Sequence, residues 1–217
     1  MRLLLYGGTF DPPHNGHLHN LQAAAARVKP DLVIVMPAGV PPHKAASHTP
    51  AALRLEMCGC FAALGGTANI PRLEVSSWEI RQAETGVRNY TLDTVKMLEA
   101  AYAGAEIFLA VGSDMLLSFD TWHCWQALMQ RAALVVTSRE SDDAAVLHAK
   151  AAQLDPAGER ILFAAVSALP MASHTLRARL AAGESCAEAL PACVRAVIRR
   201  EGLYRTADGE RLEKSIT

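Results

Sequence analysis

The chain has 217 residues, of which 51% are hydrophobic and 20% are charged, and its formal net charge is −1. This composition excludes a disordered or low-complexity protein, because it provides enough apolar surface for a core. The near-zero charge argues against a general basic surface for nucleic acid or an anionic membrane. We expect residues 1–204 to form one globular domain and residues 205–217 to be a polar tail.

The cysteines and the N-terminus indicate the compartment. The five cysteines are an odd number and include no C-x-x-C pair, so neither a disulfide framework nor a zinc ribbon is indicated. The first apolar run ends after Tyr6, too early for a secretory signal, and no apolar stretch approaches the roughly 18 residues of a membrane span. We therefore expect a cytoplasmic protein that does not enter membranes.

Short apolar runs of strand length alternate along the chain with longer stretches of helical spacing. The predicted strands are Leu3–Tyr6, Leu32–Met36, Glu106–Val111, Ala133–Thr137 and Ile161–Ala164, with another near Leu73–Val75. The predicted helices are Leu18–Val28, Ala51–Leu64, Thr91–Tyr102, Trp122–Arg131, Ala144–Leu154 and Pro191–Arg200. This alternation favours an α/β fold: a Rossmann-like, doubly wound parallel sheet with helices on both faces, in a single domain.

Polar or glycine-containing segments follow four of these strands. In a parallel sheet the carboxyl ends of the strands share one edge, where open α/β sheets bind ligands. One such segment alone would be an ordinary loop, but four together predict a site. The segments are Gly7-Gly8-Thr9, Pro37-Ala38-Gly39, Gly112-Ser113-Asp114 and Ser138-Arg139.

The first of these segments continues as G-G-T-F-D-P-P-H-N-G-H-L into the first predicted helix. The glycine pair allows the backbone to approach a ligand closely. We expect Asn15 to cap a helix that begins near Gly16, whose free amides would bind phosphate. His14 and His17 lie one helical turn apart and would flank that phosphate, donating hydrogen bonds to it.

Two other interpretations of the histidines remain open. His14, His17 and His19 could ligate a metal ion such as zinc, although no cysteine or acidic residue has suitable local spacing. The first two could also be a purely structural pair. The glycine pair immediately before a helix favours the phosphate site over both.

These residues resemble the signature of the nucleotidyltransferases with an H-x-G-H motif. Nearly the whole chain is similar to one branch of them, the bacterial nicotinate-nucleotide adenylyltransferases. The matching segments after the first motif are Met36–Lys44, Asn89–Thr94, Gly112–Asp114 with Trp122 and Trp125, and Gly202–Tyr204.

The resemblance implies transfer of the AMP moiety of ATP to nicotinate mononucleotide, giving deamido-NAD and pyrophosphate in NAD biosynthesis. It also implies Mg²⁺ held mainly by the ATP phosphates, which leaves no dedicated metal ligands in the sequence. The attacking phosphate has a second pKa of about 6 and is mostly a dianion at pH 7, so no general base is expected. Alignment and charge neutralisation would then carry catalysis.

The resemblance also assigns roles to individual residues. The catalytic residues are expected to be His14, His17, Lys44 and Arg177. The ATP site adds Gly7, Gly8, Thr9, Phe10, Gly112, Asp114 and Ser173, and the mononucleotide site comprises Gly8, Thr9, Lys44, Thr91 and Trp122. Trp125 is expected in the core, because its spacing from Trp122 is typical of helix packing.

One segment departs from the family pattern. Where the family carries I-S-S-T-x-I-R or I-S-S-T-x-V-R, this chain has Met171-Ala172-Ser173-His174-Thr175-Leu176-Arg177. A hydroxyl contact to the leaving phosphates is therefore lost or replaced by the imidazole of His174. We expect Ser173 to cap a helix that carries Arg177 one turn in.

Alternatives to the main interpretation stay open. The acceptor could be nicotinamide mononucleotide or phosphopantetheine within the same chemistry, and the departure before Arg177 allows a weakened nucleotide-binding module. We expect ATP and nicotinate mononucleotide as partners, and neither nucleic acid nor a membrane. The sequence allows a homo-oligomer without requiring one.

Overall fold

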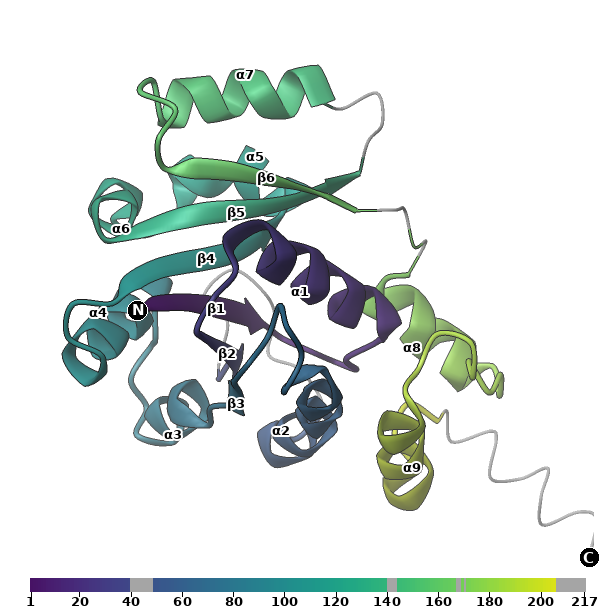
Figure 1. Cartoon of the computed structure of the whole chain (residues 1–217). Coiled ribbons are helices and arrows are strands. Elements are labelled where there is room, and N and C mark those ends of the chain that lie inside the picture. Colours follow the sequence, from purple (N-terminus) through teal and green to yellow (C-terminus); the bar gives the residue numbers. More distant parts are fainter. Residues whose placement is uncertain (40–48, 140–143, 167–168, 170, 206–217) are drawn as a thin grey trace, which may run out of the picture.

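The structure, a computed structural model, describes residues 1–39, 49–139, 144–166, 169 and 171–205. Its centre is a six-stranded sheet in the order β3-β2-β1-β4-β5-β6, in which all neighbouring strands are parallel (Figure 1). The strands are β1 (Arg2–Gly8), β2 (Leu32–Pro37), β3 (Leu73–Val75), β4 (Glu106–Gly112), β5 (Ala132–Arg139) and β6 (Ile161–Val166). All six predicted strands are confirmed, most of them with longer ends.

The strand order reverses between β1 and β4. From β1 the chain runs outward through β2 to β3, then returns to β4 on the other side of β1 and continues to β5 and β6. Tyr6 of β1 pairs with Ala110 of β4, and Gly8 pairs with Pro37 of β2. The connections that leave β1 and β4 at this edge run in opposite directions, which opens the crevice where doubly wound sheets bind ligands.

Both faces of the sheet are covered. Along β1, Leu4 and Tyr6 belong to one core cluster and Leu3 and Leu5 to the other, as the two-residue period of a strand requires. The first face carries α1 (Asn15–Val28), α2 (Ala51–Cys58), the 3₁₀ helix η1 (Gly59–Leu64), α8 (Ser173–Ala181) and α9 (Ala192–Glu201). The second carries α3 (Trp78–Glu84), α4 (Thr91–Ala101), α5 (Ser113–Leu117), η2 (Phe119–Thr121), α6 (Trp125–Arg131) and α7 (Ala144–Leu154).

Helix α1 positions the site directly. It crosses the first face in front of the sheet and packs its apolar side, including Leu21 and Ala24, into the core (Figure 1). Its N-terminus lies just past the end of β1, so the loop between them is held between two well-packed elements.

Two predicted helices differ from the structure. The single helix predicted over residues 51–64 is α up to Cys58 and 3₁₀ from Gly59 onward. The helix predicted from Trp122 begins only at Trp125. Cys124 has a left-handed backbone conformation (φ 51°), which cannot be part of a right-handed α-helix, so the helix starts after it. The predicted stop of α9 at Gly202 is confirmed by its φ of 60°.

Within the ranges that the structure describes, no helix combines the length and apolar character needed to cross a lipid bilayer.

Candidate functional site

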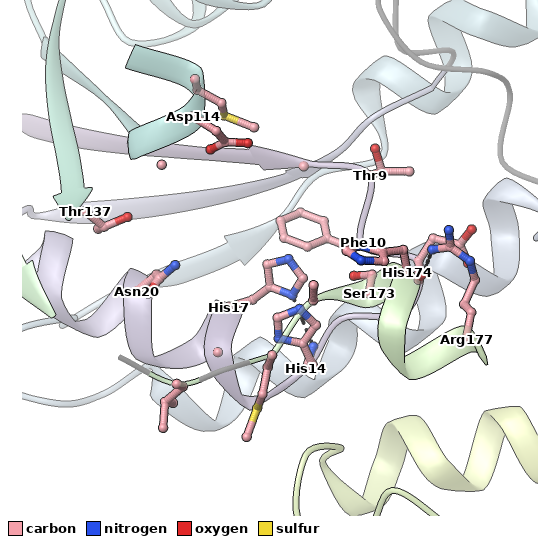
Figure 2. Close-up of a pocket in the computed structure, with 18 of the residues that line it drawn as sticks. Thr9, Phe10, His14, His17, Asn20, Asp114, Thr137, Ser173, His174 and Arg177 are labelled. Carbon is pink, nitrogen blue, oxygen red and sulfur yellow. Dashed lines mark hydrogen bonds between the residues drawn. The ribbon is translucent and has the colours of Figure 1, made fainter. Parts of the chain in front are cut away.

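A cavity of about 1240 Å³ opens at the carboxyl edge of β1 and β4. Figure 2 shows that its lining residues come from the loop after β1, from α1, from α5 and from α8. The cavity brings together ten of the residues singled out in the sequence: Gly7, Gly8, Thr9, Phe10, His14, His17, Gly112, Asp114, Ser173 and Arg177. Segments separated by more than 160 positions thus meet at one edge of the sheet.

Gly8 and Phe10 determine the conformation of the loop after β1. A Cβ on residue 8 would lie 2.8 Å from the Phe10 ring, so any larger residue would force this buried ring to shift. Phe10 has a φ of 49°, and its buried ring packs on Tyr6 and Phe61 and meets the edge of His17 at 5.1 Å between ring centroids. The Phe10 side chain therefore anchors the loop, and the backbone around Thr9 is what the loop offers to a ligand.

His14 and His17 interact directly at the start of α1. The His14 backbone N–H donates to Nδ1 of His17 at 3.2 Å, which assigns the proton of a neutral His17 ring to Nε2. The two rings stack with centroids 3.7 Å apart and an interplanar angle of 27°. His17 thereby takes the part that Glu or Gln plays in a capping box, and the pair is held as one unit.

His14 is only 5% exposed. Burial lowers its pKa to about 4, so the ring is neutral at pH 7. Its Nδ1 atom is buried and has no hydrogen-bond partner among the residues that the structure describes. That atom faces the first turn of α1, 3.0 Å from where a Cβ on Gly16 would lie and in the side-chain position of a capping box, while the ring itself borders the cavity. His14 can therefore hydrogen-bond a ligand, but as a neutral group rather than as a cation.

The N-cap of α1 is His14, so the prediction for Asn15 is wrong. The side chain of Asn15 donates instead to the backbone oxygen of Glu188 at 3.0 Å, and its backbone N–H donates to Ala189 at 2.9 Å. These two bonds attach the start of α1 to the segment that precedes α9. The side chain is therefore unavailable for capping.

Helix α8 is held against the same loop from the other side. The Ser173 hydroxyl donates to the Pro12 carbonyl at 3.0 Å, and Nη1 of Arg177 donates to the Asp11 carbonyl at 2.7 Å. Ser173 is the first residue of α8 and Ala172 is its N-cap, so the predicted capping role of Ser173 is wrong. The helix instead places Arg177 and the exposed His174 along the cavity (Figure 2).

Asp114 lines the cavity from α5. A Cβ on residue 112 would lie 2.8 Å from Oδ1 of Asp114, so Gly112 leaves the space that this carboxylate occupies. The carboxylate is exposed and offers acceptor oxygens beside the end of β4. This placement is compatible with its predicted contact to the hydroxyl pair of a ribose.

The sequence interpretation missed a buried arginine beneath the loop. Arg54 of α2 is 2% exposed and donates from Nη1 to the Thr9 carbonyl at 2.8 Å and from Nη2 to the Gly39 carbonyl at 3.2 Å. It therefore connects the segments that follow β1 and β2. Nothing local in the sequence signals this, because both acceptors are backbone oxygens of distant segments.

A second missed group comes from the end of the described chain. The hydroxyl of Tyr204 donates to the carboxylate of Asp11 at 2.5 Å, and the hydroxyl of Thr49 lies 3.4 Å from the Tyr204 oxygen. Burial, with the bond to Asp11, raises the pKa of the Tyr204 phenol far above its usual value. The residues after α9 thus support the loop that carries Asp11.

A partly buried carboxyl group lies next to the segment after β2. Burial raises the pKa of Glu79 to about 7. The Thr94 hydroxyl donates to Oε1 of Glu79 at 2.6 Å and accepts from the Asn89 amide at 2.9 Å. A Cβ on residue 39 would lie 2.3 Å from the Glu79 carbonyl oxygen, so glycine is needed at Gly39.

The predicted mononucleotide residues are only partly brought together. Gly8 and Thr9 line the cavity, whereas Thr91, the first residue of α4, and Trp122 do not. Trp122 packs on Phe119 with ring centroids 5.0 Å apart and borders the second core cluster. Lys44 lies outside the described residues. Contacts of Thr91, Trp122 and Lys44 with a mononucleotide stay predictions.

The two remaining predictions concern the packing of Trp125 and the possible metal ion. Trp125 borders the second core cluster, as expected, and its ring lies 6.5 Å from that of Phe119. Among the described residues, no group of three or more His, Cys, Asp or Glu side chains is arranged to hold a metal ion.

Known proteins resemble this chain over most of its length. The profile described as cytidylyltransferase-like matches residues 5–177. A protein of Acidithiobacillus ferrooxidans named "Probable nicotinate-nucleotide adenylyltransferase" is 34% identical, and the match covers 94% of this chain and 96% of that protein. A protein of Exiguobacterium sibiricum with the same name is 32% identical over 95% of this chain and 100% of its own.

A solved structure confirms the fold. The Plasmodium falciparum nicotinic acid mononucleotide adenylyltransferase complexed with NaAD superposes with a TM-score of 0.73 at 15% identity. The superposition covers 94% of this chain and 97% of that one. The doubly wound architecture predicted from the sequence is thus found in a known structure over nearly its full length.

Proposed function

The chain belongs to the cytidylyltransferase-like family and, within it, to the nicotinate-nucleotide adenylyltransferases, and we propose that it acts as one of them. It transfers the AMP moiety of ATP to nicotinate mononucleotide and releases pyrophosphate. The product, deamido-NAD, places the enzyme in NAD biosynthesis.

One observation carries the proposal. The loop after β1, the stacked His14 and His17 rings and the Arg177 guanidinium all border one cavity at the point where the strand order reverses. Backbone amides, imidazoles and a guanidinium are the groups that proteins use to bind phosphates. Their convergence supports a site for two phosphate-bearing substrates.

The reaction exchanges one phosphorus–oxygen bond for another. A phosphate oxygen of nicotinate mononucleotide attacks the α-phosphorus of ATP, and the bond from that phosphorus to the bridging α–β oxygen breaks. The electron pair of the broken bond leaves with pyrophosphate. Because the attacking phosphate is already mostly ionised at pH 7, with a second pKa of about 6, no side chain has to remove a proton.

The side chains then act by alignment and charge neutralisation. We assign the His17 Nε2–H and the His14 ring to the α-phosphate, where hydrogen bonds strengthen as negative charge grows in the transition state. Arg177, oriented by its bond to the Asp11 carbonyl, neutralises the departing pyrophosphate. Arg54 holds the Thr9 carbonyl, which orients the neighbouring peptide groups of the loop.

Two roles rest on the resemblance alone. Lys44, outside the described residues, would neutralise the incoming phosphate. Thr91 and Trp122 would meet the nicotinate ring, which would require the ring to reach beyond the cavity that Gly8 and Thr9 line.

Magnesium fits this site as an ion carried by ATP. Of the two aspartates that line the cavity, Asp11 is bonded to Tyr204, which leaves Asp114 as the exposed carboxylate there. Mg²⁺ prefers octahedral oxygen ligands and usually keeps several waters, so it needs few protein ligands. When bound, it would reduce repulsion between the two phosphate-bearing substrates.

We also propose a cytoplasmic location. All five cysteines are free thiols, and three of them, Cys58, Cys60 and Cys186, are buried. Free thiols persist where the compartment is reducing.

The decisive experiment is an acceptor panel. Purified protein is incubated with ATP, Mg²⁺ and either nicotinate mononucleotide, nicotinamide mononucleotide or phosphopantetheine, and dinucleotide and pyrophosphate are followed together. We expect both products in equal amounts, fastest with nicotinate mononucleotide. Preference for another acceptor would reassign the substrate, and ATP binding without any product would indicate a binding module.

A further inference from the structure

Asn20 of α1 is a further polar side chain that borders the cavity. It follows His14 and His17 at the same three-residue interval along α1 and lines the same cavity. Figure 2 shows Asn20 further along α1 than the two histidines, on the side of the cavity where Thr137 of β5 lies. Residues at this spacing share one helix face, so Asn20 extends the row formed by the histidines.

The side-chain amide of Asn20 is partly buried, and no hydrogen bond satisfies it within the described part of the chain. Two other asparagines differ in this respect, because Asn15 donates to the Glu188 carbonyl and Asn89 to the Thr94 hydroxyl. Polar groups with restricted access to water normally find partners. The amide of Asn20 is therefore available to a ligand in the cavity.

The side chains that line the cavity indicate which part of ATP the Asn20 amide would contact. Apolar side chains of α7, β6 and the segment before α8 also border the cavity, namely Leu147, Val166, Leu169 and Met171, of which Met171 lies beside Gly16 at the start of α1. The Thr137 hydroxyl is already used, because it donates to the Val111 carbonyl at 3.2 Å. The cationic side chain Arg177 lies at the other end, beyond the histidines (Figure 2).

We propose that Asn20 hydrogen-bonds the adenine ring of ATP and contributes to the choice of nucleotide; this rests on the proposed function. A partly apolar cavity with an unsatisfied amide far from the Arg177 guanidinium suits a flat heteroaromatic ring at that amide better than a phosphate. The amide oxygen accepts a hydrogen bond from the 6-amino group, and the amide nitrogen donates to N7; in ITP both N7 and the 6-carbonyl are acceptors, so one of the two bonds is lost. Asparagine and adenine form such two-bond pairs in other settings.

The test compares ATP with ITP, in which a carbonyl oxygen replaces the 6-amino group. In Asn20→Ala we expect KM for ATP to rise about fivefold or more and the ATP-to-ITP preference in kcat/KM to fall by a similar factor. The melting temperature should stay the same or rise, because alanine is the better helix former. The matched control is Gln22→Ala, an exposed residue of the same helix, which should keep both the wild-type KM and the wild-type preference.

A second variant distinguishes base from phosphate. Asn20→Asp keeps an oxygen that can accept from the 6-amino group but repels the 6-carbonyl of ITP, so its preference for ATP should equal or exceed that of the wild type. Loss of both nucleotides in Asn20→Asp would place the side chain beside phosphates and overturn the inference. An unchanged ATP-to-ITP preference in Asn20→Ala would also overturn it. Neither outcome would change the result that the wild type gives in the acceptor panel, so the inference about Asn20 and the proposed function can fail independently.

Discussion

The neutral state of His14 makes a quantitative prediction about pH and stability. Its pKa is about 4 in the folded protein, against the ordinary 6.5. Between these values the unfolded chain binds a proton that the folded chain does not, so stability falls as the pH falls through this window. At about 1.4 kcal/mol for each pH unit, the gap limits the total effect to about 3 kcal/mol, of which about 2 kcal/mol falls between pH 7 and pH 5.

The assay is urea unfolding of the wild type and of His14→Gln at both pH values, followed by tryptophan fluorescence. The comparison must be between the two proteins, because Glu79, whose folded pKa of about 7 lies above the ordinary 4.5, works in the opposite direction over the same range. We expect the variant to lose about 2 kcal/mol less than the wild type on going from pH 7 to pH 5. Gln22→Ala, which removes no titratable group, should lose as much as the wild type. Equal losses in wild type and His14→Gln would refute the view that burial keeps this imidazole neutral.

Three further predictions test the supports of the site. Gly39→Ala should lower the free energy of unfolding, measured by urea titration, by about 1–3 kcal/mol, because its Cβ would lie 2.3 Å from the Glu79 carbonyl oxygen. The control is Gly59→Ala, which should not destabilise the protein, because a Cβ at Gly59 meets no heavy atom within 4 Å. Tyr204→Phe should cost about 1.5–3 kcal/mol in thermal or urea unfolding, because the Asp11 carboxylate loses its phenol donor; a wild-type melting curve would contradict this contact. Arg177→Lys should lower kcat/KM for ATP by about tenfold or more, while the melting temperature changes little. The reason is that an ammonium group cannot both hold the Asp11 carbonyl and pair with a phosphate through two bonds. Unchanged steady-state kinetics would show that Arg177 does not act in the site.

The strands and the sheet edge could be predicted from sequence because their signals are local. Apolar runs such as Leu3–Tyr6 have strand length, and the glycine-containing segments that follow them mark the edge at which parallel strands end. The cavity confirms that the first motif, Gly112–Asp114 and Arg177 meet there. This much follows from alternation of elements and from the direction of parallel strands.

One error has a non-local cause and the other lies in the backbone next to the residue. Asn15 has the side chain of a typical N-cap, but the carbonyl of Glu188, 173 positions away, takes its amide. Trp122 has the spacing of a helical residue, but the left-handed backbone of Cys124 separates it from α6. For Asn15, a tertiary contact overrides the local preference.

The contacts that Arg54 and Tyr204 make with the loop after β1 have no local sequence signal. Arg54 looks like an ordinary helix-surface cation until the carbonyls of Thr9 and Gly39 are brought to it by two different strands. Tyr204 lies 193 positions from the Asp11 carboxylate to which it donates. Such contacts could be found only after the fold had placed the two ends of the chain together.

The central claim is that the imidazole pair at the start of α1 accelerates transfer by binding the phosphate in its transition state, without moving a proton. The most direct test is the single-turnover rate of His17→Ala with Mg²⁺, ATP and nicotinate mononucleotide, alongside its circular dichroism spectrum. We predict a native spectrum and a rate lower by about 10²–10³, the loss typical of removing one such donor. A rate close to that of the wild type, with the spectrum unchanged, would contradict the account.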